Sequence, residues 1–188
     1  MAGAGIGCKY PVYGTYSCTS GTVSHTSGKV LGKAVKVSAT YEKNDVKLYA
    51  DDGLVESDTS FKSGKLTAEI YGLSLDDRAT LLGHTALAES AVGFTGKSTD
   101  TAPYVGFGFY ARRSDNKYVA IFYSKVKFSE PKDEMETKGE TTAYKNTELE
   151  ADILTDDTDE FIEVQEFATE AAAKTYLDGK VGISAAGE

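Results

Sequence analysis

The chain has 188 residues and a formal net charge of −9, and 40% of its residues are hydrophobic. A chain of this length buries roughly 70% of its extended surface as one domain, so folding requires neither a metal nor a disulfide. Twelve tyrosines and eight phenylalanines, with no tryptophan, favour strands. Length and composition therefore indicate one soluble, strand-rich domain over residues 1–188.

The acidic residues are concentrated in the last third of the chain. Residues 129–188 contain 17 acids and 5 bases, a net charge of −12, whereas residues 1–128 carry +3. Proteins that bind nucleic acid owe much of their affinity to Lys and Arg side chains, which displace counterions from the phosphate backbone. The charge therefore argues against a nucleic-acid-binding protein, although an acidic surface suits a conduit along which DNA passes without sticking.

The first residues hold no basic segment followed by an apolar core, and no run of 18 uncharged apolar residues occurs anywhere. We therefore expect neither secretion by a signal peptide nor a membrane span. Cys8 and Cys18 flank a nine-residue loop. In an intracellular chain of this size, two reduced thiols are favoured over a disulfide.

Residues 1–30 are rich in Gly, Ser and Thr, and their apolar residues are too scattered to form a core face. This composition predicts a flexible N-terminal arm that becomes ordered by contact with another surface. From residue 34 the pattern alternates, which predicts a half-buried strand. Its apolar face holds Val35, Val37, Ala39 and Tyr41.

Residues 42–61 predict a projecting hairpin or long loop. Turn-forming residues precede a short strand at 46–50, and the tight turn Asp51-Asp52-Gly53 leads to a returning strand at 54–57. Residues 65–71 then predict a second core strand, because Leu66, Ala68 and Ile70 share one face.

A short helix is predicted after this strand. Ser74 is a suitable N-cap, Asp76 and Asp77 suit the first turn, and Gly83 suits the C-terminal end. The expected buried stripe consists of Leu75, Ala79 and Leu82.

The second half of the chain predicts a hairpin and two further elements. Residues 86–101 read as a loop, 104–113 and 118–128 as a hairpin, and 131–140 as a charged connection. Leu149, Ala151 and Ile153 alternate within a strand predicted at 144–154. Residues 169–177 read as a helix stopped by Gly179, followed by a C-terminal tail at 178–188.

The run GFGFYAR at 106–112 matches part of a strand that stacks RNA bases on alternating aromatics. Val105, Tyr110 and Arg112 depart from that pattern, and the second long helix of that fold is not predicted, so RNA binding is disfavoured. The glycines at 3–7 lack the spacing and the preceding strand of a dinucleotide-binding turn.

Other candidate sites also have a simpler interpretation. His25 and His84 have no acid or nucleophile at a spacing that indicates a catalytic triad, so solvated or loop histidines are expected. The acidic runs 51–53 and 156–160 could supply oxygen ligands to calcium, but solvated acidic turns are the favoured reading. We therefore predict no catalytic residue, cofactor or metal, and no enzyme.

Four segments are informative when they are taken together and in order: LYADDGLVESDTSF, LTAEIYGLSLDD with the helix after it, VGFGFYARRSDNKYVAIFYSKVKFSEP, and TKGETTAYKNTELEADI. In this order they resemble the major tail tube protein of long-tailed bacteriophages with non-contractile tails, the siphophage major tail proteins. The resemblance covers roughly residues 33–151.

The resemblance implies a β-sandwich or barrel of the tail-tube type, flanked by a helix, that assembles into hexameric rings. Stacked rings would form a tube in the virion through which viral DNA is ejected without specific binding, after assembly in the host cytoplasm. Expected partners are further copies of the chain and the tape-measure, tail-terminator and tail-tip proteins, with no membrane. The related tubes of contractile tails and of type VI secretion share this fold.

The resemblance also assigns roles to segments. The 42–61 projection would contact the adjacent ring, while the arm and tail would become ordered in the assembled tube. The expected ring-stacking residues are Val46, Leu48, Tyr49, Asp51, Asp52, Leu54, Val55 and Phe61. We also hypothesise that acidic side chains line the lumen. The alternative function is a monomeric β-sandwich module that binds carbohydrate through its tyrosines, or a protein ligand.

Overall fold

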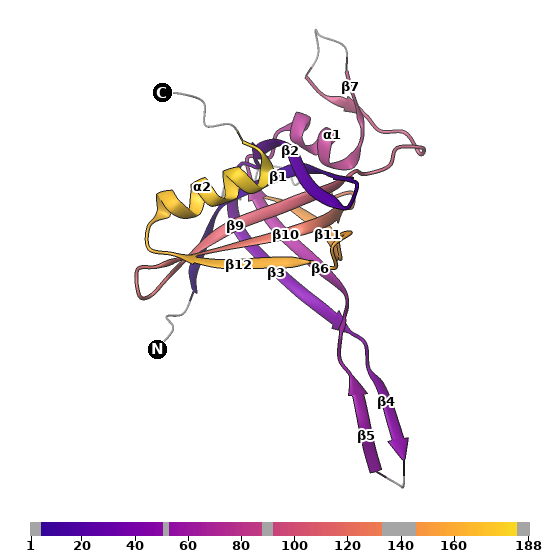
Figure 1. Ribbon diagram of the computed structural model, residues 1–188. Coiled ribbons are helices and arrows are strands. Elements are labelled where there is room, and N and C mark those ends of the chain that lie inside the picture. The colour runs from indigo at the N-terminus through magenta and orange to yellow at the C-terminus, as the bar shows by residue number, and fades with distance from the viewer. Residues whose placement is uncertain (1–4, 51–52, 88–91, 133–145, 184–188) are drawn as a thin grey trace, which may run out of the picture.

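The computed structural model describes residues 5–50, 53–87, 92–132 and 146–183 (Figure 1). Within these residues the fold is mostly β with two short helices, which confirms the predicted fold class at that level. An eight-stranded antiparallel sheet runs in the order β2-β1-β9-β10-β11-β6-β3, and β12 pairs with β10. Its strands are β1 (Gly5–Thr19), β2 (Thr22–Val30), β3 (Lys33–Lys43), β6 (Phe61–Tyr71), β9 (Tyr104–Arg113), β10 (Tyr118–Phe128), β11 (Thr147–Leu154) and β12 (Ile162–Phe167).

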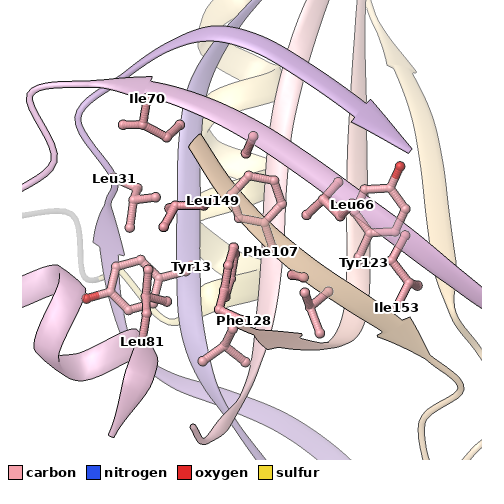
Figure 2. Packing of buried hydrophobic residues seen from close by; sticks show 14 of the residues in the cluster. Tyr13, Leu31, Leu66, Ile70, Leu81, Phe107, Tyr123, Phe128, Leu149 and Ile153 are labelled. Carbon is pink, nitrogen blue, oxygen red and sulfur yellow. The ribbon is translucent and has the colours of Figure 1, made fainter. Parts of the chain in front are cut away.

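The sheet curls, so that β3 at one end of the strand order comes close to β1. The main hydrophobic core lies inside this curl (Figure 2). It receives the alternate residues of β6 and β11 that the sequence pattern predicted: Leu66, Ala68, Ile70, Leu149, Ala151 and Ile153. The predicted hairpin of β9 and β10 is confirmed, and Phe107 of β9 lies in the centre of this core.

Helix α2 (Glu170–Val181) covers the opposite face of the sheet (Figure 1). Ala173, Leu177 and Val181 are buried at successive turns and pack on side chains of β1, β9 and β10. Because neighbouring residues of a strand point to opposite faces, Val12 contacts the α2 layer while Tyr13 lies in the main core. The sheet therefore carries a hydrophobic cluster on each face.

Helix α1 (Leu75–Leu82) closes one end of the main core. The predicted caps are confirmed: the Ser74 side chain accepts a hydrogen bond from the Asp77 backbone N–H, and Gly83 is left-handed. The predicted stripe was wrong at Leu75, which is half exposed. Leu81 is buried in its place, because the helix packs through its C-terminal half.

The expectation of a flexible arm over residues 1–30 was wrong for residues 5–30. This segment forms β1 and β2, and β1 pairs with β9 in the main sheet. Its glycines and small residues let other parts of the chain approach closely: a Cβ at Gly14 or Gly28 would lie 2.7 Å or 2.4 Å from the Val181 carbonyl oxygen. Residues 1–4 lie outside the described part.

Two further predictions were wrong, one about the end of a helix and one about the buried face of a strand. Helix α2 continues through Gly179 to Val181 and is capped by left-handed Gly182, so a C-terminal tail from residue 178 was wrong for residues 178–181. In β3, a register shift between Ala34 and Lys36 turns Val35 outward, and Val35 is half exposed. Residues 133–145 and 184–188 of the predicted connection, strand and tail lie outside the described part.

The loop predicted at 86–101 contains a small hairpin. Its strands are β7 (Thr85–Ala86) and β8 (Phe94–Thr95), which pair with each other in antiparallel fashion. Residues 88–91 between them lie outside the described part.

Candidate assembly interface

The strands β3 and β6 continue beyond the main sheet into a separate hairpin. Its strands are β4 (Val46–Ala50) and β5 (Gly53–Asp58), which pair only with each other among the strands described. The Asn44 backbone N–H donates to the Ser60 carbonyl at 2.9 Å, and the Asn44 side chain donates to the Ser60 hydroxyl at 2.9 Å. The hairpin extends away from the body of the molecule (Figure 1).

Most of the residues predicted for ring stacking fall in this hairpin. Val46, Leu48 and Tyr49 are in β4, and Leu54 and Val55 are in β5. Leu48 pairs with Glu56 and Tyr49 with Leu54, with a register shift between the two pairs.

The other three predicted residues are not part of β4 or β5. Asp51 and Asp52 fall outside the described residues, so the acidic-turn interpretation at the hairpin tip stays a prediction. Phe61 begins β6 at the base of the hairpin, where it is half-buried.

Phe61 belongs to an aromatic cluster that the sequence did not reveal. Its ring stacks on Phe161 with centroids 3.9 Å apart and planes within 4°. Tyr41 lies edge-on to both rings, and its hydroxyl is 3.1 Å from that of Tyr123. The rings of Tyr41, Phe61 and Phe161, together with Lys43 and Ile162, line a shallow apolar depression of about 190 Å³. The cluster fixes the base of the hairpin against the loop before β12.

Three strands of the main sheet pair on one side only within the described residues: β2 with β1, β3 with β6, and β12 with β10. Unpaired strand edges present backbone donors and acceptors to which another strand can bind. Val35 of β3 and Val164 of β12 are 50% and 56% exposed on these strands. The body therefore offers both backbone and apolar surface for association.

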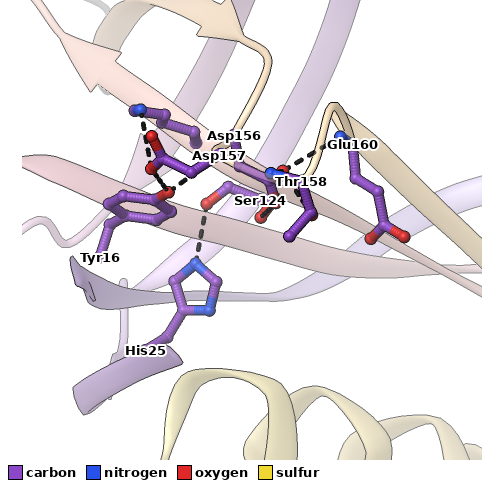
Figure 3. Close-up of polar contacts among 8 residues, drawn as sticks. Tyr16, His25, Ser124, Asp156, Asp157, Thr158 and Glu160 are labelled. Carbon is purple, nitrogen blue, oxygen red and sulfur yellow. Dashed lines mark hydrogen bonds and ion pairs between the residues drawn. The ribbon is translucent and has the colours of Figure 1, made fainter. Parts of the chain in front are cut away.

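Ser124 marks the point where β10 changes partner. Residues before it pair with β12 and residues after it pair with β11, and the register to β9 shifts between Tyr123 and Val126. His25 of β2 reaches across the sheet, and its Nε2 lies 2.7 Å from the Ser124 carbonyl oxygen (Figure 3). Burial lowers the pKa of His25, so the neutral ring donates this hydrogen bond.

Ser124, His25 and Asp156 do not form a catalytic triad despite their residue types. The Ser124 hydroxyl donates to the Asp156 carboxylate, while His25 contacts the Ser124 carbonyl oxygen (Figure 3). A triad requires the histidine to take the proton of the serine hydroxyl, with the acid on the far ring nitrogen. The His25 ring instead gives the Ser124 carbonyl oxygen a hydrogen-bond partner at the point where β10 changes its neighbouring strand. The expectation of a solvated His25 was wrong, because its partner lies 99 residues away in sequence.

The acidic run 156–160 is held within the fold, so the expectation of a solvated turn was wrong for Asp156. Asp156 is buried and also accepts hydrogen bonds from the Thr158 hydroxyl and from the backbone N–H groups of Thr158 and Glu160. Burial disfavours its charge, but these hydrogen bonds outweigh that effect and keep its pKa below the ordinary value. Asp157 pairs with the Tyr16 hydroxyl and with Lys125 (Figure 3).

His84 lies in a loop, as predicted, but its side chain is partnered rather than solvated. Its ring lies between the carboxylates of Asp100 and Glu130. Within the described residues, no group of three or more His, Cys, Asp or Glu side chains is arranged to hold a metal ion. Cys8 and Cys18 are both free thiols.

The sequence offered two interpretations based on exposed aromatic rings: RNA binding by the GFGF run and carbohydrate binding by tyrosines. Phe107 and Phe109 of the GFGF run are buried, so they cannot stack on RNA bases. Several tyrosine faces are covered by lysine: Lys125 lies over Tyr16, Lys125 and Lys127 over Tyr104, and Lys174 over Tyr10. Rings covered in this way are poor platforms for a sugar.

Comparison with protein-family models and with curated proteins found no match for this chain. Neither α1 nor α2 is long and apolar enough to cross a membrane.

Proposed function

We propose that this chain is a structural virion protein that assembles into stacked hexameric rings and forms the tube of a bacteriophage tail. The observation that carries the proposal is the β4–β5 hairpin, which leaves the main sheet and pairs only within itself among the described strands. An isolated two-stranded hairpin is at best marginally stable in water. A neighbouring subunit would supply the surface on which this hairpin packs.

The body has features that suit such an assembly. Its one-sided strands β2 and β12 offer edges that neighbouring subunits can extend into a continuous wall, whereas β3 lies close to β1 of the same chain. The apolar depression around Phe61 and Phe161 lies at the base of the hairpin, where it adds non-polar surface. A tube would thus use the sheet edges within a ring and the hairpin between rings.

The charge of the chain supports its proposed role as a conduit. At −9 overall, the subunit repels the DNA backbone, so DNA would pass through the lumen without specific binding. Outward positions on β11 carry Glu148, Glu150 and Asp152, which are all exposed. Tape-measure, tail-terminator and tail-tip proteins would bind the tube at its axis or its ends.

Removing the hairpin tests the proposal. In a variant that joins Asn44 to Ser60 through a Gly-Ser turn in place of residues 45–59, we expect a folded, soluble β protein that no longer forms tubes. The ends to be joined are already held together by backbone and side-chain hydrogen bonds. Circular dichroism and thermal unfolding would establish that the body is intact, and electron microscopy would report assembly.

Two multiple-substitution variants of the hairpin distinguish the contribution of its apolar side chains to assembly from that of its charged side chains. Replacing Leu48, Leu54 and Val55 together by Ser should abolish tubes, because apolar burial drives most association. Replacing Lys47 and Glu56 by Ala changes two residues of the same hairpin and should leave tubes intact. Tubes formed by the deletion variant would remove the hairpin from the mechanism.

A further inference from the structure

Residues 84–87 and 92–101 belong to an excursion between α1 and β9, and the two ends of this excursion meet. Gly83 is left-handed, and a Cβ at this position would lie 2.3 Å from the Thr101 carbonyl oxygen. The strands β7 and β8 lie within the excursion, which projects beyond α1 (Figure 1). The close approach at Gly83 and the hydrogen bond from the His84 backbone N–H to the Ala79 carbonyl oxygen fix the start of the excursion against α1.

The His84 side chain attaches the excursion to the body of the molecule. Its Nδ1 lies 2.9 Å from the Asp100 carboxylate, and its Nε2 contacts the carboxylate of Glu130, which follows β10. The ring stacks on Phe94 with centroids 4.9 Å apart and planes within 12°. The His84 side chain is only 8% exposed. It therefore joins the excursion to a segment 46 residues further along the chain.

The two carboxylates determine the protonation state that fits this geometry. A neutral imidazole carries one N–H, and its other nitrogen is an acceptor, whereas the imidazolium donates from both nitrogens. Carboxylates on both sides are therefore satisfied together only by charged His84. We propose that His84 is a pH-sensitive latch: when charged it ties the 84–101 excursion to the segment after β10, and when neutral it releases Glu130.

The surroundings determine which carboxylate is released. Asp100 is 12% exposed and also accepts a hydrogen bond from the Lys97 backbone N–H at 2.8 Å. Glu130 is 56% exposed, and the Arg78 guanidinium lies 3.5 Å away. Loss of the proton from Nε2 thus leaves the Nδ1–H bond to Asp100 in place, while Glu130 turns to Arg78 and solvent.

The charged groups around His84 set the direction of the switch. The hydrogen bond to Asp100 contributes most and raises the pKa of His84 above its ordinary 6.5, with a further contribution from Glu130 and opposition from desolvation. Arg78 of α1, which lies over Phe94, and Lys97 are the positive groups nearby. A raised pKa means that the latch stabilises the fold fully below pH 6.5 and loses this contribution as pH rises through the folded-state value.

Nuclear magnetic resonance of the whole protein tests the latch directly, because His25 is the one other histidine in the sequence. Long-range proton–nitrogen spectra across a pH series should show His84 protonated on both nitrogens, with a midpoint above 6.5. The backbone amides of Phe94, Gly96 and Glu130 should shift with the same midpoint. Their hydrogen exchange, corrected for intrinsic rates, should increase about tenfold above it, as expected for losing roughly one hydrogen bond.

Two variants make the test specific. Glu130→Gln removes one of the two charges and should lower the His84 midpoint, and the exposure of Glu130 favours an intact fold. Glu166→Gln, which alters a carboxylate paired with Arg113 and Lys117, is the control and should leave the midpoint unchanged. A midpoint at or below 6.5 in the unmodified protein, amides that do not follow His84, or no effect of Glu130→Gln would overturn the proposal.

Discussion

Gly106 of β9 lies directly against the ring of His25. A Cβ at this position would be 2.5 Å from His25 Cδ2 and 2.6 Å from the Phe122 ring, distances that force both rings to move. His25 packs edge-on against Phe122 and donates to the Ser124 carbonyl. The glycine therefore allows a histidine of β2 to reach β10 across the two intervening strands, β1 and β9.

We expect Gly106→Ala to destabilise the protein by about 1–3 kcal/mol, because overpacking displaces His25 and breaks its hydrogen bond. Gly179→Ala is the control: it lies in α2, its backbone is helical, and the added Cβ would meet no atom within 4 Å apart from the neighbouring residues and backbone of its own helix. That change should stabilise the protein by up to about 1 kcal/mol through helix propensity. Equilibrium unfolding in urea would compare the two, and equal stability of Gly106→Ala and the parent would contradict this account.

Residue-scale contacts were the least predictable from the sequence. His25 contacts a residue 99 positions away, and His84 contacts Asp100 and Glu130 from two different segments. Spacing motifs capture partners on the same turn or strand, so they miss pairs that only the fold brings together. Asp156 likewise reads as part of a solvated acidic run, although its carboxylate is buried by a turn of its own chain.

Elements with strong local signals were predicted well. The alternation in β6 and β11 and the caps of α1 follow from rules that act within a few residues. The strands β1 and β2 were missed because their glycines and small residues resemble a flexible arm. In the fold, Gly14 and Gly28 instead provide the space into which α2 packs.

The docking of α2 gives a prediction at this scale. Leu177 is fully buried, and its side chain occupies the space left by Gly108 of β9. We expect Leu177→Ala to cost about 2–5 kcal/mol by leaving a cavity between helix and sheet. The exposed Thr175→Ala on the same helix should change stability by less than about 0.5 kcal/mol. Thermal unfolding would check both, and a Leu177→Ala variant as stable as Thr175→Ala would refute this packing.

At the scale of the whole molecule, the curled sheet and the projecting hairpin differ in how much hydrophobic packing each finds within its own chain. The sheet carries a hydrophobic cluster on each face, and both clusters are built within one chain. The hairpin is a separate two-stranded ladder, and strands β2, β3 and β12 each leave one edge without a strand among the described residues. These features fit the proposed self-association, which at the level of the sequence was only an expectation.

Negative-stain electron microscopy of the purified protein over a concentration series, with light scattering on the same samples, would show whether the chain assembles by itself. We expect hollow rings or tubes at high concentration, with light scattering that rises as they form. A protein that remains a monomer at every concentration would contradict self-assembly through the hairpin and the sheet edges.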